Sequence, residues 1–136
     1  MMVNESLKKI VPPLELCQQI PEGKFADSVF EWYVPSGAAA KEAFAPCVII
    51  RNYSAASGSK DNCPAPTLAE ILEALPTRIE RPLERFLVLY DARNTKGTFQ
   101  VGYTGWITGN DPRFREQDRN PATAALRLWL KMEVGQ

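Results

Sequence analysis

Two alternating runs in the second half of the chain constrain its fold most. Residues 85–91 and 98–107 alternate apolar side chains with small or polar ones, and only residues 92–97 separate them. A period of two is typical of a strand with one buried face, and so short a connection joins antiparallel neighbours. Gly97 can supply the positive φ that a tight turn needs. The sequence therefore predicts a β-hairpin, and the fold must accommodate it.

Further elements are predicted on both sides of this hairpin. Helical segments are expected at 5–20, where Pro12 and Pro13 interrupt the helix and a second one starts at Pro13, and at 67–75 and 121–133. Strands are expected at 28–34 and 47–53. The resulting order, α-β-β-α-β-β-α, contains hairpins and no βαβ alternation. We therefore expect an α+β fold with an antiparallel or mixed four-stranded sheet and helices mainly on one face. A length of 136 residues suits a single domain over 1–136.

Charge and cysteine content narrow the possible partners. The net charge is zero, so no global basic field attracts nucleic acid or an anionic membrane. Residues 1–75 hold six Lys/Arg against nine Asp/Glu, and residues 76–136 hold ten against seven. This polarity favours a homo-oligomer or a local anion site, unless the charges are scattered on a solvated surface. The three cysteines are an odd number without CxxC spacing, and neither a signal peptide nor a membrane span is apparent. We therefore expect a cytoplasmic protein with reduced thiols, of which Cys63, in a predicted loop, is the candidate for reactivity.

The composition removes the commonest catalytic groups. The chain contains no histidine, which is the commonest general base and metal ligand, so no cofactor or metal is expected. The run Ser57–Lys60 matches an S-x-x-K pattern, but its Gly/Ser composition indicates a loop. An enzyme would have to use acidic residues with a divalent metal, and the loop-end candidates are Asp91, Asp111 and Asp118.

A possible anion site precedes the last predicted helix. Three arginines come before its N-terminus, where Asn120 is expected to cap the helix. Two aromatic residues at the end of the preceding strand could stack on a flat ligand. The alternatives are a salt-bridged surface loop and core packing. The predicted ligand-binding residues are Arg113, Arg115, Arg119, Asn120, Tyr103 and Trp106.

Two helical motifs carry a resemblance. The segments Pro64–Pro76 (PAPTLAEILEALP) and Asn120–Leu130 (NPATAALRLWL) resemble those of small uncharacterised phage- and prophage-encoded α+β proteins. The resemblance implies a phage-encoded accessory protein in a bacterial host cell, similar in kind to counter-defence factors. It implies no site residues.

Three functions remain open at this stage. The first is a non-catalytic binding protein that sequesters an anionic small ligand, such as a nucleotide signal. The second is a protein–protein interaction module that inhibits a host protein through its acidic N-terminal half or an exposed sheet edge. The third is a small carboxylate- and metal-dependent hydrolase.

Overall fold

The computed structural model describes residues 7–35, 45–52, 57–58, 61–80, 85–105 and 109–134. The chain divides into two compact units, Met1–Thr67 and Leu68–Gln136, and each is described by itself. The predicted α+β class is confirmed, with two antiparallel sheets. The single domain over 1–136 stays a prediction. In the described ranges, no helix has the length and apolar character needed to cross a membrane.

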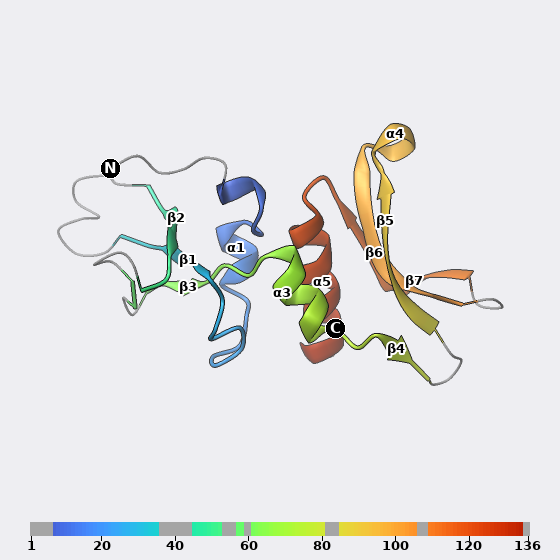
Figure 1. Ribbon diagram of the computed structural model, residues 1–136, viewed down its shortest axis with the longest axis horizontal. Helices are drawn as coiled ribbons and strands as arrows, with labels where there is room; N and C mark the ends of the chain where they lie inside the picture. The colour runs from blue at the N-terminus through green and yellow to red at the C-terminus, as the bar shows by residue number, and fades with distance from the viewer. Residues whose placement is uncertain are drawn as a thin grey trace. The chain divides into compact units, whose positions relative to one another are not determined.

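Unit 1 (Met1–Thr67) is built around a three-stranded antiparallel sheet in the order β2-β1-β3 (Figure 1). Its elements are η1 (Leu7–Lys9), α1 (Leu14–Cys17), β1 (Phe30–Tyr33), β2 (Cys47–Ile50) and β3 (Cys63–Pro64). Strands were predicted at 28–34 and 47–53, where β1 and β2 lie. Central strand β1 places Glu31 opposite Ile49 on one side and Pro64 on the other.

The prolines near the start of unit 1 explain why its helices are short. The segment predicted to be helical over 5–20 forms only η1 and α1, because Pro12 and Pro13 each lack an N–H and Pro13 has an extended conformation. The freed carbonyl of Pro12 accepts hydrogen bonds from Trp32 Nε1, at 3.0 Å, and from Cys17 Sγ, at 3.5 Å. These bonds tie α1 to the sheet across a buried contact.

Unit 2 (Leu68–Gln136) contains a four-stranded antiparallel sheet in the order β4-β5-β6-β7 (Figure 1). Helix α5 packs on β6 and β7, and α3 packs on α5. Its elements are α3 (Leu68–Ala74), β4 (Arg78–Ile79), β5 (Arg85–Ala92), α4 (Arg93–Lys96), β6 (Thr98–Gly105), β7 (Gly109–Asp118) and α5 (Pro121–Val134).

The predicted hairpin is confirmed as β5 and β6, which pair from Phe86 opposite Thr104 to Ala92 opposite Thr98. The short helix α4 and Gly97, with a φ of 72°, form the connection. The face of β6 toward α5 carries Val101 and Tyr103, both buried.

Two expectations differ from the structure. The strands predicted for one sheet are divided between the two sheets, since among the described strands β1 pairs with β2 and β3 and with none of unit 2. The polar loop predicted over 108–119 is wrong, because residues 109–118 form β7. As an edge strand, β7 can include Pro112 without losing an interior ladder bond. Two cations on α5 hold it: Lys131 pairs with Glu116, and Arg127 Nη1 lies 3.2 Å from Asp118 Oδ2.

Candidate functional site

The predicted arginine site lies on and just after β7. Arg113 and Arg115 belong to the strand, although the Arg113 side chain lies outside what the structure describes. Arg115 is partly buried, and Arg119 is exposed in the bend that follows. The acids of this segment, Glu116 and Asp118, pair with cations of α5.

Asn120 caps α5, as predicted. Its Oδ1 accepts hydrogen bonds from the main-chain N–H groups of Ala122, at 2.9 Å, and Thr123, at 3.4 Å. The Asp118 carboxylate in turn accepts the Asn120 N–H at 2.9 Å. These side chains therefore occupy N–H groups that an anion would need at the helix N-terminus.

Of the two predicted aromatic residues, the structure describes Tyr103, and it does not bring Tyr103 to Arg115. Tyr103 is 1% exposed, and its hydroxyl donates to the Pro76 carbonyl at 2.5 Å. Burial raises the pKa of Tyr103 to about 12. Arg115 lies opposite Gly102, so its side chain and that of Tyr103 project from opposite faces of the sheet. Trp106 lies outside the described residues.

The predicted acidic candidates do not form a cluster among the residues that the structure describes. Asp91 and Asp118 both lie opposite Phe99, but on different neighbours of β6, so a strand separates them. Asp91 is exposed and pairs with Arg93 at 2.8 Å. The Asp111 side chain is outside the described part of the chain. No group of three or more acids and cysteines in this part could hold a metal ion.

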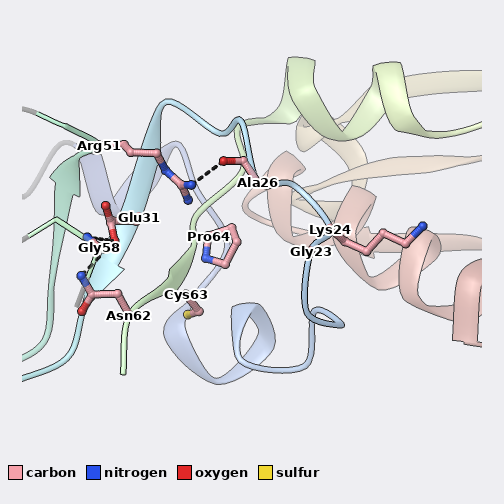
Figure 2. A pocket seen from close by; sticks show the side chains of 9 residues that line it. All are labelled: Gly23, Lys24, Ala26, Glu31, Arg51, Gly58, Asn62, Cys63 and Pro64. Atoms are coloured by element: carbon pink, nitrogen blue, oxygen red, sulfur yellow. Dashed lines mark hydrogen bonds between the residues drawn. The ribbon is translucent and has the colours of Figure 1, made fainter. Parts of the chain in front are cut away.

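A small open pocket of about 240 Å³ lies in unit 1 (Figure 2). Its lining comes from segments 23–26 and 62–64, from Arg51 and Gly58, and from Glu31 of β1. This volume is below the range of about 300–1,000 Å³ that is usual for small-molecule sites. Figure 2 shows the Glu31 carboxylate directed at Gly58 and Asn62, and the Arg51 guanidinium directed at Ala26.

Glu31 organises the polar wall of this pocket. It is 4% exposed, and it accepts hydrogen bonds from Ser57 Oγ at 2.5 Å and Asn62 Nδ2 at 2.9 Å. The Gly58 N–H donates a third at 3.2 Å. Desolvation opposes ionisation, but these bonds and the nearby Arg51 charge outweigh it and lower the pKa of Glu31. We call Glu31, Arg51, Ser57, Gly58 and Asn62 the Glu31 network.

Other members of the network also form hydrogen bonds within unit 1. Ser57 Oγ accepts the Asn52 N–H at 2.9 Å, and Asn62 Oδ1 accepts the Val34 N–H at 3.1 Å. Arg51 Nη1 donates to the Ala26 carbonyl. A carboxylate with a lowered pKa is a weak base, so Ser57 is a hydrogen-bond donor here and not an activated nucleophile. The network therefore suits the fixing of a turn better than catalysis.

Cys63 lines the same pocket. It was predicted to lie in a loop, and this prediction is wrong because Cys63 belongs to β3. Burial, and then the Glu31 charge, raise the pKa of Cys63 to about 11. The thiol therefore stays protonated near neutral pH, where a reactive cysteine would be a thiolate.

Unit 2 has a different unusual feature, an exposed apolar strand. Phe86, Val88 and Tyr90 project from one face of β5, and Leu89 projects from the other. These four side chains are between 39% and 58% exposed. The alternation of residues 85–91 predicts that Phe86, Val88 and Tyr90 share one face.

On one side, part of the β5 main chain pairs with no strand that the structure describes. The short strand β4 pairs only with Arg85 and Phe86, and the Leu87 N–H donates to the Thr77 carbonyl at 3.0 Å. Since main-chain groups alternate sides along a strand, those of Leu89 and Asp91 point the same way as the Leu87 N–H. No described strand pairs with them there. We call this side of residues 88–92 the open edge of β5.

Comparison of the chain with protein-family models, with curated proteins and with solved structures finds no match. The assignment of a function therefore depends on the two sites described above.

Proposed function

We propose that this protein is a non-catalytic binding module that recognises an extended polypeptide by strand addition at the open edge of β5. The observation that carries the proposal is the exposure of four large apolar side chains on one incompletely paired strand. Soluble proteins usually protect edge strands with charges, prolines or bulges, and contiguous exposed apolar patches commonly mark interaction sites. Only Asp91 provides such a charge within residues 86–91.

The chemistry of β5 fits this mode of recognition. The N–H and C=O groups of Leu89 and Asp91 can supply main-chain hydrogen bonds to an added strand. Side chains on both faces can then contact alternate side chains of that strand, with Val88 and Tyr90 on one face and Leu89 on the other. The expected ligand is an extended segment with apolar residues on at least one of its faces.

The small-anion hypothesis remains a prediction, but the geometry supports it less well. Its stacking residue Tyr103 and its cation Arg115 project from opposite faces of the sheet, and Asn120 satisfies helix N–H groups. The resemblance to phage-encoded proteins would make a bacterial host protein the partner of β5, which is an expectation from the resemblance alone.

Fluorescence anisotropy with a labelled peptide of alternating Val and Thr, flanked by Lys, tests the proposal. We expect the full chain to bind it and Leu89→Pro to weaken binding at least about tenfold, because proline removes an outward N–H and leaves the β5–β6 ladder intact. Ile50→Lys is the matched control, since Ile50 and Leu89 are both 43% exposed. Absence of binding by the folded wild type at concentrations where it is monomeric, or equal loss in both variants, would contradict the proposal.

A further inference from the structure

We infer that the segment that pairs with the open edge of β5 is β5 of a second copy of this chain, related by a two-fold axis. This inference rests on the proposed function and names its partner. A two-fold axis presents the same surface on both copies, so each edge would satisfy the other. The surface must then be self-complementary in direction, in main-chain pattern and in charge.

Direction and main-chain pattern fix the pairing register. Two copies of one strand related by a two-fold axis perpendicular to the sheet run antiparallel. Because β4 and Thr77 occupy the edge opposite Arg85, Phe86 and Leu87, pairing can begin only at Val88. Beyond Leu87, the main-chain N–H and C=O groups that point away from β6 belong to Leu89 and Asp91. For each of these two residues to pair with the other in the second copy, the two-fold axis must pass at Tyr90, which lies between them.

In this register Leu89 lies opposite Asp91 of the second copy, and each exchanges both main-chain hydrogen bonds with the other. Tyr90 lies opposite Tyr90 of the second copy as a non-hydrogen-bonded pair, in which side chains approach most closely. Val88 is the next apolar residue on the same face. The exposed tyrosines, which are 58% exposed in the single chain, thus cover each other. Aromatic cross-strand pairs of this kind stabilise antiparallel sheets.

Charge favours a second copy over a strongly charged partner. The chain has sixteen basic and sixteen acidic residues, so two copies carry no net repulsion, and a net charge near zero promotes association. Near the axis, the Asp91 carboxylate already pairs with Arg93 of its own chain. The approach of two copies therefore brings paired charges together rather than two bare carboxylates. The resulting dimer would contain one continuous sheet running from β7 of one copy to β7 of the other.

Disulfide trapping tests this register directly. In the proposed pairing the two Cα atoms of residue 90 are about 4.5 Å apart, within the range that a disulfide spans. Tyr90→Cys should therefore form a covalent dimer under mild air oxidation of the full chain. Val88→Cys is the matched control on the same face, because its two copies would lie about 13 Å apart along the strand. We expect Tyr90→Cys to cross-link at least about tenfold faster than Val88→Cys or the wild type, which share the native cysteines.

Sedimentation velocity over a concentration series supplies the second measurement. The wild type should show a concentration-dependent monomer–dimer equilibrium, and Leu89→Pro, with its fold checked by circular dichroism, should remain monomeric. A wild type that stays monomeric, or cross-linking of Tyr90→Cys no faster than of Val88→Cys, overturns the second-copy inference. If the Val/Thr peptide still binds in that case, the proposed function stands with another partner. If the peptide also fails to bind, both proposals fail.

Discussion

The two units place their unusual groups in opposite ways. Unit 1 buries a charged group, Glu31, and surrounds it with hydrogen-bond donors. Unit 2 exposes large apolar side chains on β5, and no described strand pairs with part of the β5 main chain. A buried charge is costly unless it is paired, whereas an exposed apolar patch is costly unless something covers it. The first arrangement is formed within one chain, and we propose that a partner completes the second.

This difference separates stability from binding. Substitutions in the Glu31 network should change the folding of unit 1 and leave association at β5 intact. Substitutions of exposed β5 side chains should do the reverse. The comparison fails if either kind of substitution has the effect assigned to the other.

The largest effect is expected for Glu31→Ala. This change removes the acceptor for Ser57, Asn62 and the Gly58 N–H and leaves the nearby Arg51 without its counter-charge. Loss of one partner from a buried charged network typically costs about 3 kcal/mol or more. Hydrogen exchange measured by mass spectrometry should show faster exchange in unit 1, with unit 2 much less affected. The control is Glu22→Ala, at an exposed glutamate, which should shift stability by less than about 0.5 kcal/mol.

Acidification provides an independent check on Glu31. Its folded-state pKa is lowered below the ordinary value of 4.5, so protons bind more tightly to the unfolded chain. The stabilisation is therefore present above about pH 4.5 and is lost as the pH falls through the folded pKa. Urea unfolding should show a smaller acid-dependent loss of stability in Glu31→Ala than in the wild type. Equal acid sensitivity in both would mean that Glu31 is not the responsible group.

A smaller but clear effect is expected at Gly102, which positions β7 in unit 2. An added Cβ would lie 2.6 Å from the Phe114 carbonyl oxygen and 3.0 Å from Arg115 Cα, and neither backbone atom can move without shifting the strand. Overpacking of this kind costs about 1–3 kcal/mol. Gly102→Ala should therefore accelerate amide exchange in β7.

The matched control for this change is Gly97→Ala. No atom approaches its added Cβ within 4 Å, but its φ of 72° strains an L-residue. Its effect should be confined to the turn between β5 and β6. If amide exchange in β7 of Gly102→Ala is as slow as in the wild type, β6 and β7 can accommodate the added methyl group without loss of pairing, and the prediction is wrong.

Local patterns predicted much of unit 2. The alternation of residues 85–91 and 98–107 specified the hairpin, and Asn120 with Pro121 specified the start of α5. Such features depend on neighbours in the sequence. Strand β7 was missed because its residues are polar, and it forms through pairing with β6 and contacts with α5 that no local periodicity records.

The candidate sites were harder to predict because both depend on residues far apart in the sequence. Glu31 was expected simply to alternate along a strand, and its donors lie 26 to 31 residues away. The one indication in the sequence that Glu31 is buried was its position between two aromatic residues, Phe30 and Trp32. For β5, the apolar pattern predicted a strand correctly but did not indicate which side chains are exposed. Its exposure follows from the shortness of β4 and the position of α5 over β6 and β7, which sequence periodicity does not contain.

The smallest effect on folding is expected where the effect on binding is largest. Leu89→Lys replaces an exposed side chain, so the loss of buried apolar area in the single chain is small, and stability should change by less than about 0.5 kcal/mol. Lysine on an edge strand opposes pairing with another strand. Urea unfolding at low protein concentration should therefore match the wild type, while peptide binding and dimer formation decrease. If Leu89→Lys instead destabilises the monomer by 2 kcal/mol or more, on the scale of a core substitution, then β5 is an ordinary buried strand and the contrast between the two units is lost.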